Sequence, residues 1–384
     1  MRRRKSGAWL ALGLLAMGAG VGAWAQEGSS PGGSPGVSPS LVLGGSVLEQ
    51  AYGSYDDSGL TASGDFGYGS STTLELNIDA KGEKARASAS LEAAVLDGEA
   101  AQAAWLYRPY DPVDELFVPE TAQQAASMGG PDLLLAARVR TLYAKLDEDW
   151  VSILAGRQVI NYERGAIWSP TDLFTRLDLS GLSPERLGSD ALRLVFPFGA
   201  TGGLDLAAAP GADPAAGLYS ARLSGLVMGV DGALTAARDG EAATSSIGAD
   251  FKADLGAGIY GDLIYSRPDS GSSGSLRAAG GADWSFGDFI VAAEYYYNGG
   301  GVAADLLFPD AQNLYADLTW RVSEFLNVSS SAIWDLGGQS GDLLILGSWS
   351  AAQNAGLSAY AKLLWGQSSL SQGLQLGATL ELSF

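Results

Sequence analysis

Strict alternation of apolar and polar residues constrains the fold of this chain more than any other feature of its sequence. In the stretch 374–384, LQLGATLELSF, every even-numbered residue is apolar and every odd-numbered residue is polar or glycine. Successive side chains of a strand point to opposite faces, so this stretch predicts a strand with one apolar and one polar face. About eleven residues also suffice for a tilted strand to cross a bilayer.

Similar alternating segments recur every dozen residues or so from Leu41 onward, which is the spacing of an all-β chain. We expect about eighteen strands, or sixteen if a weak hairpin around 202–238 merges. Their predicted positions are 41–55, 71–80, 84–95, 134–146, 149–158, 189–197, 202–209, 217–228, 230–238, 244–254, 256–267, 275–284, 287–297, 312–321, 325–335, 341–350, 355–365 and 373–384.

One segment, 134–146, departs from simple alternation. Arg138 and Arg140 share a face with Leu142, and the two alternate residues after Leu142 are again apolar. A β-bulge near Thr141 would restore the pattern, and so would a different strand boundary.

Long and short connections alternate between the predicted strands, with short ones of zero to four residues. This layout is typical of an antiparallel transmembrane β-barrel with long outer loops, tight periplasmic turns and both termini in the periplasm. The final strand should then pair with 41–55 and turn Gln375, Thr379 and Glu381 toward water. A soluble β-sandwich or propeller is the alternative, but small apolar residues such as Ala85, Ala87 and Ala89 would fill its core poorly.

Composition excludes several classes of protein. The chain has no Cys, no His and a formal charge of −20, with 47 % hydrophobic residues. It therefore has no disulfide, no Ser-His-Asp triad and no histidine or cysteine metal ligand, and we predict neither an enzyme nor a cofactor or metal site. So acidic a chain is not expected to bind nucleic acid.

The first 40 residues form two predicted regions. Residues 1–25 have the layout of a signal peptide: a basic start, an apolar core and the cleavage sequence Ala23-Trp24-Ala25. An uncleaved anchor helix is the alternative. Residues 26–40 are rich in Gly, Ser and Pro and predict a flexible leader. The barrel is expected over 41–384, with long loops at 96–133 and 159–188.

The stretch 156–188 does not alternate and is too long for a plain turn, so we expect a functional loop or a plug. Ser169, Pro170 and Asp172 predict the start of a short helix, with Ser169 as its N-cap. The charges of the stretch are nearly balanced inside an acidic protein. They are Arg157, Arg164, Arg176 and Arg186 against Glu163, Asp172, Asp178 and Glu185.

Two sequence features resemble those of bacterial outer-membrane porin-like β-barrels. The first is the run GRQ at 156–158, followed by an aromatic residue, Gly165, Trp168, Ser-Pro at 169–170 and Thr-Asp-Leu-Phe at 171–174. The second is the terminal Phe384, which in such barrels forms part of the assembly signal. The resemblance implies that 159–188 folds into the lumen as a constriction or lines its wall. A solvated outer loop held by salt bridges is the alternative.

Charges on the predicted polar faces suggest a further arrangement. Basic residues on early strands would face acidic residues on later strands and set up a transverse field across a pore. The alternative is that each charge pairs with a neighbouring strand. The basic candidates are Lys84, Arg86, Arg138 and Arg140, with Arg157 and Arg193 as further members, and the acidic candidates are Asp250, Asp262, Asp288, Glu294, Asp317 and Glu381.

These features together predict a passive outer-membrane channel for small hydrophilic solutes. Its expected partners are outer-membrane lipid and the barrel-assembly machinery. A surface-exposed structural or adhesin-type barrel with a plugged lumen is the alternative. The sequence does not specify the solute or the oligomeric state.

Overall fold

The computed structural model describes residues 40–56, 65–102, 115–117, 132–162, 164–174, 176–178, 185–211, 213–300, 311–337, 340–366 and 373–384. The predicted signal peptide and nearly all of the predicted leader lie outside these residues. By their contacts the described residues form two compact units. Of the described residues, the first unit holds 40–43, Asn77–Ser90 and Arg140–Gly280, and the second holds Gly44–Leu76, Leu91–Val139 and Gly281–Phe384.

The described fold is almost entirely β-structure, as predicted. The long strands are β1 (Ser40–Asp56), β2 (Asp65–Lys81), β3 (Ala85–Gly98), β5 (Leu133–Glu148), β6 (Val151–Gln158), β9 (Ser189–Phe198), β10 (Gly202–Ala209), β11 (Leu218–Val227), β12 (Val230–Asp239), β13 (Thr244–Asp254), β14 (Gly258–Pro268), β15 (Ser275–Phe286), β16 (Phe289–Asn298), β17 (Gln312–Arg321), β18 (Leu326–Asp335), β19 (Ser340–Ala352), β20 (Ala355–Trp365) and β21 (Gly373–Ser383). These eighteen strands match the eighteen predicted ones.

Among the described residues of the predicted long loops there are three further strands of three residues each: β4 (Glu115–Phe117), β7 (Arg176–Asp178) and β8 (Glu185–Leu187). A short 3-10 turn, η1 (Pro214–Ala216), precedes β11. The predicted start of β2 at 71 is six residues late, because β2 begins at Asp65 with the sequence DFGYGS, whose two glycines hide the alternation. Local alternation therefore locates strands better than it locates their ends.

The long strands and β4 form one sheet, in which the registers described are antiparallel. The last strand, β21, pairs with β1 from Ser46 opposite Ser383 to Asp56 opposite Gly373. The first and last strands thus join, and the fold is a closed antiparallel β-barrel. Phe384 extends this pairing, since its amide and carbonyl bond those of Gly45 at 3.0 Å each.

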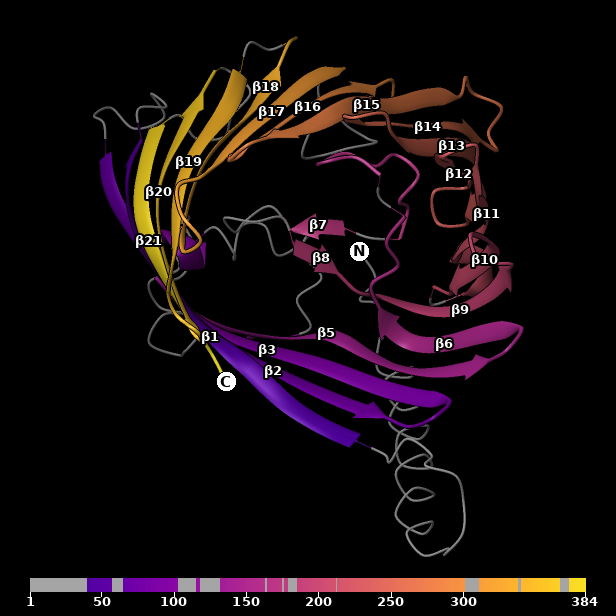
Figure 1. The fold of residues 1–384 in the computed structure, drawn as a ribbon, viewed down its shortest axis with the longest axis horizontal. Helices are drawn as coiled ribbons and strands as arrows, with labels where there is room; N and C mark the ends of the chain where they lie inside the picture. Colours follow the sequence, from indigo (N-terminus) through magenta and orange to yellow (C-terminus); the bar gives the residue numbers. More distant parts are fainter. Residues whose placement is uncertain are drawn as a thin grey trace, which may run out of the picture. The chain divides into compact units, whose positions relative to one another are not determined.

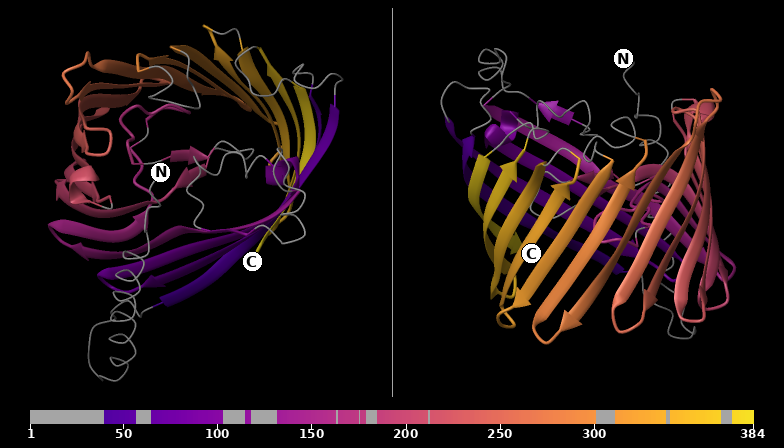
Figure 2. Two further views of the ribbon diagram at one scale, coloured as in Figure 1. Left: turned by 180° about the vertical axis from the view of Figure 1, so that it is seen from behind. Right: turned by 90° about the horizontal axis from the view of Figure 1, so that it is seen from above.

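Long and short connections alternate as predicted. In the first unit, two residues join β11 to β12 and three join β13 to β14, while 30 residues separate β6 from β9. Figure 2 shows the short turns of β11–β12 and β13–β14 at one end of their strands, and it shows β16–β20 of the second unit inclined side by side. Such short connections fix antiparallel neighbours.

The strands expose one apolar face. On β21 Leu376 is 54 % exposed, and on β12 Leu234 is 61 % exposed, whereas Thr235 beside it is 2 % exposed. The same pattern holds at Leu192, Leu223, Ile247 and Leu263, which are all exposed. We call this apolar side the outer face and the opposite side the inner face. Within the described residues there is no helix long and apolar enough to span a membrane.

The alternation of β5 changes phase along the strand. At its start Leu134 is buried between exposed Leu133 and Leu135. Near its end Leu146 is exposed, so it lies on the outer face. Lys145 before it is opposite Leu154 of β6, and Leu154 is opposite Arg193 of β9, so these three residues share the inner face. Even-numbered residues are therefore inward first and odd-numbered residues later, which agrees with a bulge near Thr141.

Candidate functional site

The stretch between β6 and β9 folds back onto the inner face of the first unit. Figure 1 shows it in magenta on the concave side of β9–β13, together with β7 and β8. We call its described residues 159–162 and 164–174 the folded-in segment. Its contacts to β9–β14 define the candidate site, and the arrangement agrees with the expectation that this stretch folds inward.

Apolar side chains hold the beginning and end of the segment. Ile160, Tyr162 and Phe174 are buried in one cluster with Ala191 of β9 and Ala207 of β10. The rings of Tyr162 and Phe174 meet edge to face, with their centroids 6.3 Å apart. Because Ala191 and Ala207 are small, the wall of the barrel leaves room for these larger side chains. Fully burying one such side chain contributes about 1.5–3 kcal/mol.

Arg164 fastens the middle of the segment to two strands. Its Nη1 and Nη2 donate to Oδ2 and Oδ1 of Asp231 on β12 at 2.5 and 2.9 Å, and its Nε donates to Oδ1 of Asp250 on β13 at 2.9 Å. Burial lowers the pKa of Arg164, but the hydrogen bonds to Asp231 and Asp250 more than offset this and raise it above its ordinary value. The guanidinium therefore stays charged and bridges two carboxylates.

Asp250 is the centre of this arrangement, and its side chain is fully buried. Besides Arg164 it accepts from Arg222 of β11, through Nη1 at 2.5 Å and Nη2 at 2.8 Å. Arg222 also donates to Thr235 Oγ1 at 3.0 Å and lies 4.8 Å from the centroid of the Tyr162 ring. Two guanidiniums thus neutralise one buried carboxylate, which is how a buried charge becomes tolerable.

Asp262 of β14 holds the Ser169-Pro170-Thr171 turn of the segment. Its Oδ2 accepts from Ser169 Oγ at 2.7 Å and from Thr171 Oγ1 at 2.9 Å, and its Oδ1 accepts from the Thr171 amide at 3.2 Å. Thr171 is fully buried. The predicted short helix is absent, since the described chain has only a turn here, closed by the Asp172 amide on the Ser169 carbonyl at 3.0 Å. The Ser169 hydroxyl that would cap a helix is instead bound by Asp262.

The remaining charged candidates of this stretch lie at its two ends. Arg157 pairs with Asp190 directly opposite it on β9, at 3.0 Å from both Nε and Nη2. Arg186 of β8 pairs with Asp172 of the segment at 3.2 Å, and burial lowers the pKa of Arg186. Arg176, Asp178 and Glu185 belong to the β7–β8 hairpin, and their side chains, like Glu163, lie outside the described residues.

The basic candidates of the early strands have acidic partners close by in sequence or on a neighbouring strand. Lys84 pairs with Glu148 at 2.7 Å, and Arg86 pairs with Asp79 at 2.8 Å. In the second unit Arg138 of β5 pairs with Glu92 of β3 at 2.8 Å. Local pairing is thus common among these candidates, and the transverse field remains a prediction.

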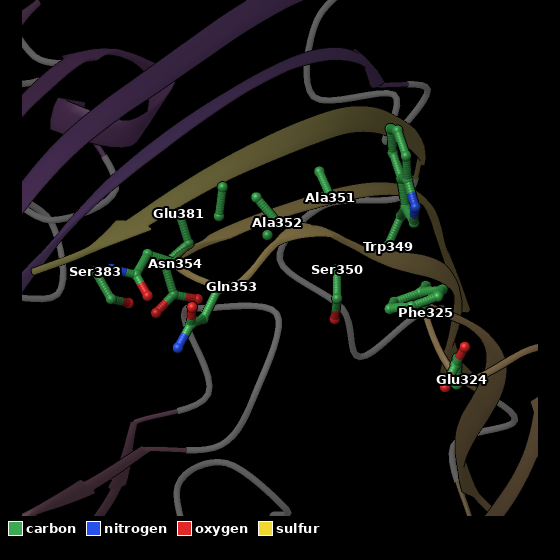
Figure 3. A pocket seen from close by; sticks show the side chains of 12 residues that line it. Glu324, Phe325, Trp349, Ser350, Ala351, Ala352, Gln353, Asn354, Glu381 and Ser383 are labelled. Atoms are coloured by element: carbon green, nitrogen blue, oxygen red, sulfur yellow. The ribbon is translucent and has the colours of Figure 1, made fainter.

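The acidic candidates of the second unit occupy three kinds of position. Glu294 of β16 is buried, and Asp317 of β17 accepts from Thr319 at 3.2 Å. Asp288 lies in the turn before β16, not on the strand as predicted. Glu381 lines an open pocket at the short-turn end of β17–β21, together with Glu324, Phe325 and Trp349 (Figure 3).

Three residues that hold the segment were not among the predicted ones. Asp231 pairs with Arg164 of the segment, and Arg222 pairs with Asp250, the other partner of Arg164. Asp205 of β10 binds Arg193 of β9 at 2.5 Å, and Arg193 lies against the Tyr162 ring. A signal was present: Arg222 stands between Ser220 and Ser224 on the polar face of its strand, directly opposite Asp205. The hairpin register could have paired these two, although the structure gives each a different partner.

No family model and no curated protein matches the chain. Solved structures do resemble it. The outer membrane protein OpdK from Pseudomonas aeruginosa is 12 % identical, with a TM-score of 0.56 over 90 % of this chain and 98 % of OpdK. A BenF-like porin from Pseudomonas fluorescens Pf-5 is 10 % identical, with a TM-score of 0.59 over 90 % and 99 %. OccAB1 of Acinetobacter baumannii is 10 % identical, with a TM-score of 0.55 over 89 % and 96 %.

The chain has the fold of these outer-membrane porins. The match spans nearly the full length of each solved chain, so the likeness concerns the fold as a whole. At this level of identity the likeness concerns the fold, and it confirms the predicted resemblance to porin-like barrels.

Proposed function

We propose that the chain is a passive channel of the outer membrane for small hydrophilic solutes, narrowed by the folded-in segment. The observation that carries the proposal is a barrel with an apolar outer face whose polar inner face holds a charged, tightly fastened segment. A barrel of about eighteen strands encloses an aqueous lumen unless it is plugged.

The outer face supports the location. Exposed Leu, Ile and Phe side chains line it in both units. In contact with lipid instead of water, these side chains carry no hydrophobic penalty. Strands in a barrel satisfy their own backbone hydrogen bonds, which hydrocarbon requires. Export through a signal peptide at 1–25 and insertion by the barrel-assembly machinery through Phe384 belong to this proposal.

The inner face supports transport of polar solutes. Beside the folded-in segment the side chains of Asp231 and Arg164 are 45 % and 18 % exposed, so a passing solute would meet fixed charges of both signs. One similar solved structure is OpdK with vanillate, a small carboxylate. Vanillate is therefore one useful test solute, beside neutral sugars and amino acids.

Single-channel recording tests the proposal. Purified, folded protein in a planar bilayer should give steady stepwise currents, and proteoliposomes should swell in isotonic solutions of small sugars but not of large oligosaccharides. A barrel that folds, as judged by heat-modifiable gel migration, but gives neither current nor swelling would overturn the proposal. That result would favour a plugged structural or adhesin-type barrel.

A further inference from the structure

Gly248 of β13 lies directly beneath the folded-in segment. It belongs to a cross-strand row in which it is opposite Thr235 on β12 and Ile264 on β14. Thr235 is 2 % exposed and Ile264 is fully buried, while Thr171 of the segment, also fully buried, lies over the row. The next row of the inner face holds Asp250 opposite Asp262, the two carboxylates that bind the segment.

Because Gly248 has no side chain, the methyl group of Thr171 can lie directly against the backbone of β13. A Cβ at this position would lie 2.7 Å from Thr171 Cγ2 and 2.8 Å from the carbonyl oxygen of Leu263. Both distances are far inside van der Waals contact, so an added methyl would have to move something. Gly248 has no positive φ, so the backbone itself does not demand glycine there.

We propose that Gly248 is a positioning residue for the constriction: it forms a slot that receives the Thr171 methyl and so sets how deeply the segment seats on Asp262. The slot and the hydrogen bonds depend on each other. Thr171 Oγ1 and its amide reach Asp262 only when its methyl lies in the slot. The effect on pore width rests on the proposed function, whereas the seating of the segment does not.

A cysteine reporter measures the seating without requiring transport. The chain has no native Cys, so Ile167→Cys places a single thiol on the segment at a position that is 6 % exposed. In this background we expect Gly248→Ala to speed maleimide labelling about tenfold, which corresponds to about 1.4 kcal/mol of lost seating. The matched control is Gly232→Ala on the neighbouring strand, where a Cβ meets nothing closer than 3.5 Å, and it should label at the parent rate.

A second substitution should partly reverse the first. Thr171→Ser removes the clashing methyl but keeps the hydroxyl that bonds Asp262. The double variant Gly248→Ala with Thr171→Ser should therefore label more slowly than Gly248→Ala alone. The contact with the Leu263 carbonyl remains, so the reversal is expected to be incomplete. Single-channel conductance should follow the same order, highest for Gly248→Ala.

The possible outcomes separate the two proposals. Parent-rate labelling of Gly248→Ala, or a double variant no slower than the single one, would overturn the slot. If Gly248→Ala does not fold, Thr171→Ile can be compared with Thr171→Val, since both lack the hydroxyl that bonds Asp262 and only Ile adds bulk. Thr171→Ile should label faster than Thr171→Val, and equal rates would also overturn the slot. If labelling behaves as expected but the parent protein carries no current, the slot stands and the proposed channel fails.

Discussion

Arg164 Nε donates to Asp250 Oδ1 at 2.9 Å, joining two residues that lie 86 positions apart in the chain. The Asp250 side chain is fully buried, whereas Asp231, the other partner of Arg164, is 45 % exposed. The two carboxylates bind the same guanidinium in very different surroundings. Their substitutions should therefore differ in cost.

Asp250→Ala should destabilise the folded protein by about 3–5 kcal/mol, because it leaves the buried Arg222 guanidinium without its carboxylate. Asp231→Ala is the matched control and should cost no more than about 1 kcal/mol, since exposed ion pairs are weak. Urea unfolding of the protein in lipid bilayers, followed by tryptophan fluorescence, measures both. Equal costs for the two variants would contradict this account of the site.

Arg164→Ala should loosen the segment and raise both the single-channel conductance and the open-channel noise. Arg164→Lys should lie between this variant and the parent, because an ammonium cannot bond two carboxylates through a planar fork. Planar-bilayer recordings at low voltage provide the comparison. A conductance for Arg164→Ala equal to that of the parent would mean that the segment does not border the pore.

Removing Arg138 and Arg140 together should shift the reversal potential in a salt gradient toward cation selectivity, since it leaves acidic charge in excess on the inner face. Arg238→Ala is a suitable control, because Arg238 pairs with Asp269 at the loop end of β12 and its side chain is 42 % exposed. The absence of a shift in the double variant would rule out the transverse field.

Met228→Asn should stabilise the β11–β12 hairpin by about 1 kcal/mol. Met228 and Gly229 form a two-residue turn with φ values of 54° and 83°, and Met228 is 98 % exposed. Asn tolerates this left-handed conformation better than an unbranched apolar residue does. Unfolding in urea provides the measurement, with Val227→Asn on the adjoining strand as a control that should give no gain.

Acid should separate the loops at 240–243 and 269–274. The guanidinium of Arg238 hydrogen-bonds Asp269 and lowers the pKa of that carboxyl, and the Asp269 amide donates to the Ala243 carbonyl at 2.9 Å. A lowered pKa means that the pair stabilises this contact above the ordinary Asp value of about 3.9, and that the contribution is lost as the pH falls through the lower folded value.

Spin labels at Glu241→Cys and Ser272→Cys can follow this separation, because the chain has no other cysteine. Their distance distribution should broaden below about pH 3.9. With Asp269→Asn added, it should be broad at every pH. A distribution in the parent that stays narrow through the acid range would show that the pair does not hold the loops together.

The strands were predictable because a period of two is a local property, visible within each segment of about ten residues. The folded-in segment was predictable for the opposite reason, since 156–188 lacks that period. What could not be predicted was the choice of partners. Arg164 and Asp250 were both candidates, but their pairing depends on the path of the segment, and the part played by Arg222 depends on the register of three strands.

The prediction of a helix at Ser169 failed through the same lack of long-range information. Its hydroxyl had a plausible local use as an N-cap, but a carboxylate 93 positions later in the chain binds it instead. Asp250 and Asp262 were predicted as equivalent members of one acidic wall. In the structure the first is bound by two guanidiniums, and the second accepts from two hydroxyls and an amide.

The wall beneath the folded-in segment bears on the order of folding. The ion pairs and hydrogen bonds that seat the segment join it to β8, to Ser189 at the start of β9 and to β12–β14, all of which follow it in the chain and end at Pro268. The segment can therefore reach its place once β9–β14 have paired, before β21 meets β1. Closing these shorter loops costs less chain entropy than closing the whole barrel. A nascent barrel would thus acquire its inner obstruction while the sheet is still open.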